Sequence, residues 1–307
     1  MRQGVELYGL GPFLIASEVA FPELSAQGVA GAALGREPDV RVRLGRAPET
    51  IEGVVANETR WWASRTEYLQ RVPRVATFYV RDGREVVVDP APGAPPEDIR
   101  AYLLAPIFSQ LCFQAGRYAL HASSVRVGSG VAAFAGDSGA GKSTVAAYLT
   151  RGGGAAVSDD LCLLETETAE VRVIPVAPAL KLWPSALRVL GAPIEGLPRV
   201  WSQEEKFRLP MSATEERLPL REVVFLEWND DGEAGVAIDP VGGVEATTRL
   251  LRLMHFEYLM KPTGRQAECF RLCGRLLGQV RTSVLRRPKD FGQMDRVMER
   301  LAEYLGR

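Results

Sequence analysis

The sequence predicts an α/β protein with a smaller β-rich N-terminal domain. Three observations lead to this prediction. Residues 1–95 hold short runs rich in Val, Tyr and Phe that are separated by turn residues, whereas strand-like and helix-patterned runs alternate from residue 96 onward. A glycine-rich loop at 136–143 also joins an apolar strand-like run to a helix-patterned run. The chain of 307 residues is long enough for two cores, so we expect one domain over 1–95 and a second over 96–307.

The N-terminal domain is expected to consist of short strands. The runs "VELYGL", "DVRVRLG", "RVATFYVRDG" and "REVVVDP" have strand composition, and residues 81–84 form a turn between the last two. The tract "PAPGAPPEDI" that follows predicts a connector, in which Pro95 and Pro96 can open a helix. The domain boundary is therefore placed in this tract.

The second domain is expected to begin with a buried helix, "IRAYLLAPIFSQLCFQAGR", whose apolar residues recur at a spacing near 3.6. Two strand-like runs follow, "YALHASSVRVGSG" and "VAAFAG", and then the loop and the helix "KSTVAAYLTRG". Further strands are expected in "AAVSDDLCLLE" and "REVVFLEW", and an amphipathic helix closes the chain in "PKDFGQMDRVMERLAEYLGR".

Composition argues against several classes of protein. The chain is 46% hydrophobic and 24% charged with a net charge of −1. It therefore lacks the excess of positive charge that general nucleic-acid or membrane binding would suggest. No long uncharged apolar stretch and no signal-peptide pattern are present, which favours a cytoplasmic protein. The four cysteines lack the spacing of a zinc site, and buried thiols are the better interpretation of Cys269 and Cys273.

The loop predicts phosphate binding. Gly136-Asp137-Ser138-Gly139-Ala140-Gly141-Lys142-Ser143 fits the pattern G-x-x-x-x-G-K-[ST]. Its glycines let backbone N–H groups approach phosphate oxygens, and the following helix directs its positive end at the same anion. We expect Lys142 to contact the β- and γ-phosphates and the Ser143 hydroxyl to be a Mg²⁺ ligand. No LSGGQ-like or N-K-x-D signature is present, so the chain is expected to be a small kinase rather than a transport ATPase or a GTPase switch.

Two further features flank the loop. His121 lies 15 residues before Gly136, and Asp159 and Asp160 lie 17 and 18 residues after Lys142. Paired carboxylates at the end of a strand beside the loop would be near the γ-phosphate, where one could hold Mg²⁺ and the other could accept the proton of an attacking hydroxyl. A solvated turn and a structural histidine are the alternatives.

In order and spacing, "LHASSV", "GDSGAGKS" and "SDD" resemble the catalytic core of the HPr kinase/phosphorylase family. The resemblance implies a P-loop kinase core related to phosphoenolpyruvate carboxykinase, with ATP and Mg²⁺ as cofactors and a protein serine as acceptor. It implies Asp159 as the base, Asp160 and Ser143 at the metal, and supporting roles for His121 and Lys142. Thr144 and Lys206 are expected to join the loop in binding the nucleotide.

The segments "YGLGPFLIASEVAFPEL", "LKLWPSALRVLG", "EEKFRLP" and "VRTSVLRRPKDFGQMDRVMERL" are similar to those of stand-alone HPr kinase-like proteins. This likeness implies a peptide or small-protein substrate, with the C-terminal serine of a lasso-peptide precursor as the specific expectation, and a possible homo-oligomer. Thr144 replaces the Glu of bifunctional members and no phosphorylase signature is visible, so only the kinase reaction is expected.

Two alternative functions stay open: a regulator that binds ATP without transferring phosphate, and a kinase for free serine or a related metabolite. Lys181, Arg286 and Arg287 are weaker candidates for anion contacts. Trp183 and the pair at 61–62 are interpreted as packing residues, and His255 as structural.

Overall fold

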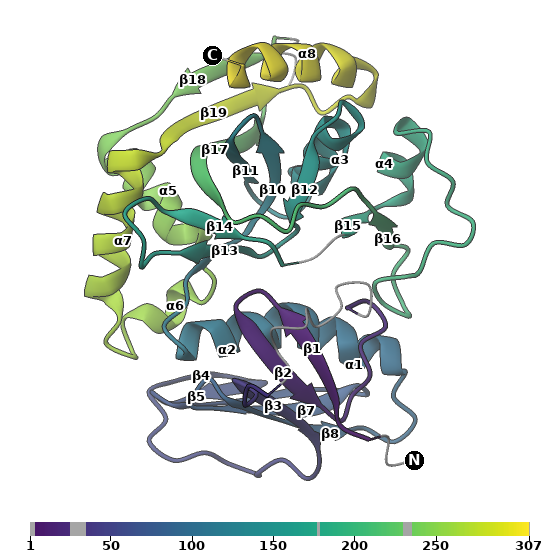
Figure 1. Ribbon diagram of the computed structural model, residues 1–307, viewed down its shortest axis with the longest axis vertical. Coiled ribbons are helices and arrows are strands. Elements are labelled where there is room, and N and C mark those ends of the chain that lie inside the picture. Colours follow the sequence, from purple (N-terminus) through teal and green to yellow (C-terminus); the bar gives the residue numbers. More distant parts are fainter. Residues whose placement is uncertain (1–3, 25–34, 177–178, 230–234, 307) are drawn as a thin grey trace. The chain divides into compact units, whose positions relative to one another are not determined.

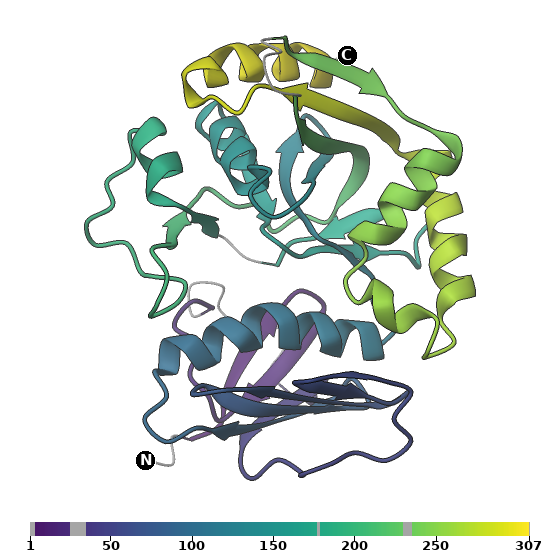
Figure 2. The same ribbon diagram turned by 180° about the vertical axis from the view of Figure 1, so that it is seen from behind.

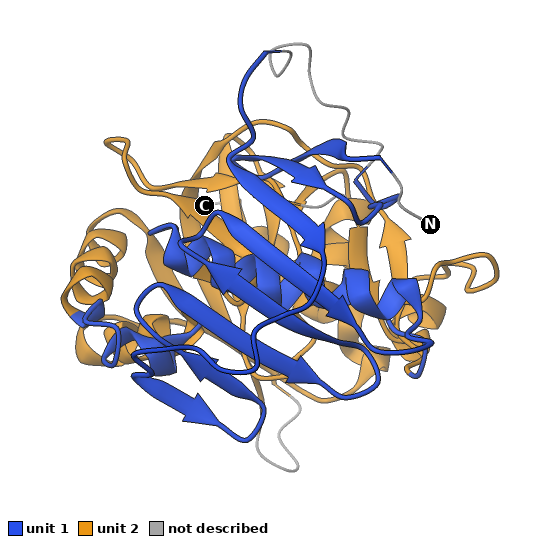
Figure 3. Ribbon diagram, turned by 90° about the horizontal axis from the view of Figure 1, so that it is seen from below, with its two compact units in different colours: residues 1–118, 201–203, 255–266 blue, residues 119–200, 204–254, 267–307 orange. Residues whose placement is uncertain are grey.

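The computed structural model describes residues 4–24, 35–176, 179–229 and 235–306. The chain forms two compact units, coloured separately in Figure 3: unit 1 comprises 1–118, 201–203 and 255–266, and unit 2 comprises 119–200, 204–254 and 267–307. Each unit combines sheet and helix, so the expected α/β class is confirmed. The first division between the units falls after Tyr118, not in the Pro-rich tract at 90–99, and two later segments also belong to unit 1.

Unit 1 is built on an eight-stranded sheet with the order β1-β2-β3-β8-β7-β6-β5-β4. Its strands are β1 (Glu6–Leu10), β2 (Phe13–Ser17), β3 (Val40–Leu44), β4 (Ala56–Glu58), β5 (Trp61–Ala63), β6 (Glu67–Val72), β7 (Ala76–Arg81) and β8 (Glu85–Pro90). Asp82 and Gly83 both have positive φ in the turn between β7 and β8, as a tight hairpin requires. The four strands predicted in this region are present, and the sequence patterns missed β2, β4, β5 and β6.

A long helical segment lies along one face of this sheet, as Figures 1 and 2 show. It runs through α1 (Pro96–Tyr102), the π-helical turn η3 (Leu103–Ile107) and α2 (Phe108–Gln114). Pro106 has no N–H to donate, and the chain widens into π-helix at this proline. Ile99, Ile107 and Leu111 are buried. The helix therefore completes the core of unit 1, which is why the unit extends past residue 95.

Two distant segments complete unit 1. The Ser202 backbone N–H and hydroxyl donate to the Asp98 carboxylate at 2.7 and 2.6 Å. The Arg265 guanidinium donates to the backbone carbonyls of Phe113 and Gln114 at the end of α2. The short helix α6 (Glu257–Met260) follows Phe256 within the second of these segments.

Unit 2 contains a nine-stranded mixed sheet with the path β12-β10-β11-β17-β14-β13-β9, to which β19 and β18 are added through β17. Its strands are β9 (Ala119–Leu120), β10 (Ala122–Val127), β11 (Gly130–Ala135), β12 (Ala155–Ser158), β13 (Cys162–Glu165), β14 (Arg172–Ile174), β17 (Leu218–Trp228), β18 (Ala237–Pro240) and β19 (Arg281–Arg287). A separate two-stranded sheet pairs β15 (Ala179–Leu182) with β16 (Phe207–Pro210). The strands β11, β17 and β19 are mutually parallel, so their carboxyl ends lie at one edge.

The helices of unit 2 are α3 (Lys142–Arg151), α4 (Pro184–Val189), α5 (Gly243–Leu253), α7 (Gln266–Gln279) and α8 (Met294–Leu305), with a 3₁₀ turn, η4 (Phe291–Gln293), before α8. Val145, Leu180, Leu285 and Leu301 belong to one core cluster that joins α3, β15, β19 and α8. Cys269 and Cys273 on α7 are buried, as predicted. Among the described residues, no helix combines the length and the apolar character needed to cross a membrane.

Candidate functional site

The glycine-rich loop leaves the carboxyl end of β11 and leads into α3. Ligands of open α/β sheets commonly bind outside the carboxyl ends of parallel strands, which is where this loop lies. Gly136, Gly139 and Gly141 have φ angles of 149°, 83° and 84°. Gly141 is the N-cap of α3 in the left-handed conformation, so the loop curls round the positive end of the helix.

Lys142 is held under the loop. Its side chain is buried, and its ammonium group donates to the carbonyls of Gly136 at 2.9 Å and Asp137 at 3.2 Å. Burial lowers the pKa of Lys142, and the nearby charges of Asp160 and Asp159 oppose this shift only in part. The positive charge of the Lys142 ammonium is therefore only partly balanced by its surroundings. An anion bound at the loop would balance it.

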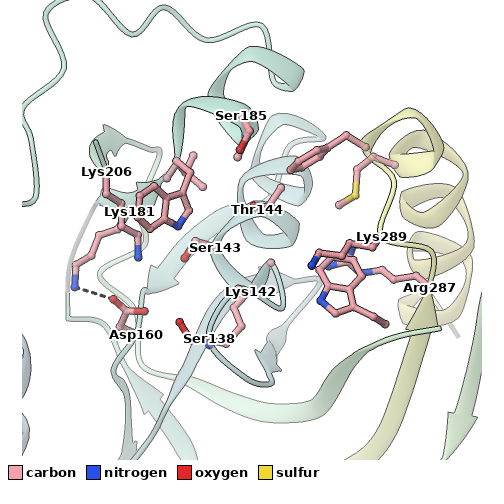
Figure 4. Close-up of a pocket in the computed structure, with 18 of the residues that line it drawn as sticks. Ser138, Lys142, Ser143, Thr144, Asp160, Lys181, Ser185, Lys206, Arg287 and Lys289 are labelled. Carbon is pink, nitrogen blue, oxygen red and sulfur yellow. Dashed lines mark hydrogen bonds and ion pairs between the residues drawn. The ribbon is translucent and has the colours of Figure 1, made fainter. Parts of the chain in front are cut away.

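A cavity of about 550 Å³ opens over the loop, and we call it the loop cavity. Figure 4 shows its polar side chains around Ser143 and Lys142, with Lys181 and Lys206 on one side and Arg287 and Lys289 on the other. Five cationic side chains line it (Lys142, Lys181, Lys206, Arg287 and Lys289) against three carboxylates (Asp160, Glu204 and Asp290). This excess of positive charge at a helix N-terminus suits a polyphosphate.

Asp159 lies beneath the loop and is 6% exposed. Its Oδ1 atom accepts hydrogen bonds from the hydroxyls of Ser143 at 2.8 Å and Ser123 at 2.6 Å, and its Oδ2 atom accepts one from the Lys181 backbone N–H at 2.7 Å. Burial and the neighbouring Asp160 charge raise the pKa of Asp159. Asp159 is thus tied to the loop serine and is not among the residues that line the loop cavity.

Asp160 faces the loop cavity. It follows β12 with a φ of 63°, a left-handed conformation that turns its side chain away from that of Asp159. Its carboxylate pairs with the Lys181 ammonium at 2.9 Å. Burial favours the neutral acid, but the charge and hydrogen bond of Lys181, with help from Lys206 and His121, outweigh it and lower the pKa of Asp160. Asp160 is therefore an ionised carboxylate at neutral pH.

Four more of the predicted residues line this cavity, whereas Gly136, Asp137 and Ala140 do not. His121 and Ser138 contribute to its wall, as do Thr144 and the half-buried Lys206. Lys206 precedes β16 and its ammonium lies 5.9 Å from the centre of the Trp183 ring. Lys181, a weaker candidate in the sequence, lies on the paired strand β15. The two-stranded sheet thus brings both lysines to one wall.

The opposite wall contains a buried arginine. Arg287 ends β19, is 4% exposed and donates to the carbonyl of Ala140 within the loop at 2.6 Å. Its guanidinium lies 4.1 Å from the centre of the Trp228 ring. Its Nε atom is buried without a hydrogen-bond partner among the described residues. Burial lowers the pKa of Arg287 to about 10.

The interpretation of Trp183 as a packing residue is wrong. Its side chain is 48% exposed and lines the loop cavity, because it lies at the N-cap of α4, between the two-stranded sheet and the helix. Ser123, Trp228 and Lys289 were missed altogether. Ser123 lies two residues after His121, so its position on the same face of a strand was the one available signal.

The oxygen ligands beside Lys142 are compatible with Mg²⁺. No cluster of three or more His, Cys, Asp or Glu side chains is found over the described ranges. Mg²⁺ commonly takes only one or two carboxylates and completes its shell with water and substrate phosphates, so such a cluster is not required. The Ser143 hydroxyl and Asp159, with Asp160 facing the cavity, offer a suitable set.

No protein-family model matches the chain, and a search of curated proteins finds none with significant similarity. The functional assignment therefore rests on the residues and their geometry.

Proposed function

We propose that this protein is an ATP-dependent kinase that transfers the γ-phosphoryl group to a serine hydroxyl of a peptide or small protein. Unit 2 would then be a P-loop kinase core of the type in HPr kinase and phosphoenolpyruvate carboxykinase. The observation that carries the proposal is the 2.8 Å hydrogen bond from the loop serine, Ser143, to the buried Asp159 beneath a cation-lined cavity. A loop serine joined to a strand-end aspartate is the arrangement that holds Mg²⁺ in P-loop proteins.

In this proposal, different residues of the loop cavity would contact the nucleotide and the acceptor. Loop N–H groups and Lys142 would hold the β- and γ-phosphates, while Lys181, Lys206 and Arg287 would offset the remaining charge. Mg²⁺, when bound beside Ser143 and Asp159, would neutralise charge on the phosphates. Asp160 would orient the acceptor hydroxyl and take its proton, because it is the one of the two paired aspartates that faces the cavity.

This division reverses the roles that the family resemblance implies for the two aspartates. Asp159 already accepts three hydrogen bonds from the protein, whereas Asp160 is ionised and faces the cavity. A base with a low pKa is compatible with phosphoryl transfer, since the proton leaves late and positioning dominates catalysis.

The competing proposal is a regulator that binds ATP without transferring its phosphoryl group. A cavity-facing carboxylate beside the phosphate loop favours the enzyme, because binding alone would not need it. A kinase for free serine would use the same loop and differ only in the acceptor site. We further propose a cytoplasmic location, on the apolar pattern of the sequence, and a lasso-peptide precursor as the first acceptor to test, on the family resemblance.

The test is phosphoryl transfer from Mg·ATP, followed by intact mass spectrometry. The acceptors are a precursor peptide encoded beside the gene, HPr and free serine. We expect one phosphate on the peptide serine. Asp160→Asn should abolish transfer while retaining Mg·ADP binding, whereas Asp159→Asn should remove the Mg²⁺-dependent part of nucleotide binding. ADP binding without transfer to any acceptor would favour the regulator.

A further inference from the structure

A second cavity of about 740 Å³ lies beside the loop in unit 2, and we call it the side cavity. It shares His121 and Ser138 with the loop cavity, so the two cavities meet at the outer part of the phosphate loop. Its other walls come from the carboxyl end of β17, with Phe225 and Glu227, and from α5, with Thr248 and Arg252.

The two cavities differ in charge. The loop cavity has five cationic side chains and three carboxylates, whereas the side cavity has two arginines (Arg249 and Arg252) and three carboxylates (Asp137, Glu227 and Glu245). The Arg249 guanidinium is less available to a ligand, since it already pairs with Glu227 at 2.7 Å and Glu245 at 2.9 Å. A polyphosphate needs an excess of cations, so it belongs in the loop cavity and not in the side cavity.

Two charged groups of the side cavity are available to a ligand. Asp137, on the loop, and Arg252, in the last turn of α5, are both exposed, and neither has a side-chain hydrogen bond or ion pair with another described residue. The walls thus offer one carboxylate and one guanidinium together with apolar groups. A volume of about 740 Å³ is in the range that encloses ligands much larger than a single amino acid.

We propose that the side cavity binds the acceptor as a peptide segment that carries no phosphate group, and that its hydroxyl reaches the γ-phosphate past His121. The inference rests on the proposed kinase function. In the reaction the acceptor oxygen bonds to the γ-phosphorus and the bond from that phosphorus to the bridging oxygen breaks. The electron pair leaves on ADP, and the hydroxyl proton passes to Asp160.

The position of His121 supports this path. His121 lines both cavities, and its backbone N–H donates to the Leu253 carbonyl at the end of α5 at 2.6 Å. Asp160 lines the loop cavity together with His121. A hydroxyl that moves from the side cavity into the loop cavity therefore passes His121 and enters the cavity that Asp160 lines.

The experiment fills the side cavity and leaves the loop cavity unchanged. Thr248→Trp places an indole in the side cavity, and Val244→Trp is the matched control, because Val244 is on the same helix, 84% exposed, and lines neither cavity. Mg·ADP binding is measured by calorimetry. Transfer from Mg·ATP is measured with an equimolar library of serine-containing heptapeptides, and with AMP and glucose 6-phosphate as phosphorylated acceptors.

We expect Thr248→Trp to lower transfer to the peptides roughly tenfold or more, since small displacements of an acceptor are costly. The ADP affinity of Thr248→Trp should stay within about twofold of the wild-type value. The ADP affinity and the peptide phosphorylation of Val244→Trp should both stay within the same range. Normal transfer by Thr248→Trp, phosphorylation of AMP or glucose 6-phosphate, or ADP binding without transfer to any peptide would each overturn the acceptor assignment. Absence of ADP binding in the wild type would instead refute the proposed kinase function.

Discussion

Arg287 at the end of β19 contacts the glycine-rich loop. Its guanidinium donates to the Ala140 carbonyl, stacks on the Trp228 ring, and lies where a side chain at residue 141 would have to be, 2.6 Å from the Cβ position of Gly141. Desolvation makes such a contact stronger than it would be in water, and it also makes the loss of either partner costly. Arg287 is therefore expected to hold the loop open for phosphate.

Replacement of Arg287 tests this role. Arg287→Met should lower the free energy of unfolding by about 1–3 kcal/mol, because it leaves the Ala140 carbonyl without its donor, and should weaken Mg·ADP binding roughly tenfold. Chemical denaturation and calorimetry measure the two effects. The matched control is Arg286→Met, since Arg286 is partly exposed and pairs only with Glu227 and Asp239 among the described residues. Equal effects of the two substitutions would contradict a specific role for Arg287.

Lys142 links nucleotide binding to pH. Burial lowers its pKa in the free protein, and a bound phosphate favours the charged ammonium and raises it. Binding should therefore take up protons once the pH approaches the lowered pKa, and affinity should fall as the pH rises through it. Calorimetry in buffers of different ionisation enthalpy measures the uptake. Lys142→Arg, which stays charged, should abolish it, and an unchanged uptake would exclude Lys142 as its source.

The loop between β11 and α3 depends on two glycines for different reasons. A Cβ atom at Gly136 would lie 2.7 Å from the Leu226 carbonyl oxygen on β17, whereas a Cβ atom at Gly139 would have no heavy atom within 4 Å. Both residues have positive φ, so both substitutions incur backbone strain. Only the first also incurs a clash with a neighbouring strand.

The two alanine variants should therefore differ in stability without any ligand. Gly139→Ala is expected to cost about 1–2 kcal/mol from strain alone, and Gly136→Ala about 2–5 kcal/mol because overpacking is added to strain. Urea denaturation of the ligand-free protein measures both. Similar losses of stability in the two variants would show that β17 shifts to accept the added methyl group. The close approach of Gly136 to the Leu226 carbonyl would then not constrain the loop.

Over the full chain, unit 1 is assembled from segments that are far apart in sequence. Asp98 is 5% exposed in α1, and it accepts two hydrogen bonds from Ser202, which lies 104 residues later. A fragment that stops at residue 95 would lack the helix that covers the sheet, and one that stops at residue 118 would lack the partners of Asp98. The unit is therefore not a simple N-terminal domain.

Asp98 provides the test of this assembly. Asp98→Ala should lower the free energy of unfolding by about 1–3 kcal/mol, because the Ser202 N–H and hydroxyl lose their acceptor. Ser202→Ala removes only the hydroxyl bond and should cost about 1 kcal/mol or less. Thermal and urea denaturation compare the two variants. If Ser202→Ala lowered the free energy of unfolding as much as Asp98→Ala, the hydrogen bond from the Ser202 backbone N–H to Asp98 would contribute little.

Local sequence patterns sufficed for much of this protein. The turn formed by the glycine-rich loop, the strand before it, α3, the long helix from Pro96, and the amphipathic α8 were all predicted, because each depends on turn chemistry or hydrophobic periodicity within a few residues. The short strands β4 and β5 were missed, since three residues give too little periodicity to detect. His121, Lys142 and Asp160 were named as candidates from the loop motif, the spacing around it and the family resemblance.

Long-range packing determined the rest. The spacing of Asp159 and Asp160 could not show that one carboxylate is buried against Ser143 while the other faces the cavity; the left-handed backbone at Asp160 and the contacts of Lys181 set this difference. Nor could it show that Arg287, 145 residues beyond Lys142, donates to the loop, or that segments 201–203 and 255–266 belong to unit 1. Such contacts join residues that no local pattern relates, because their free energy comes from burial and hydrogen bonds formed only when the chain has folded.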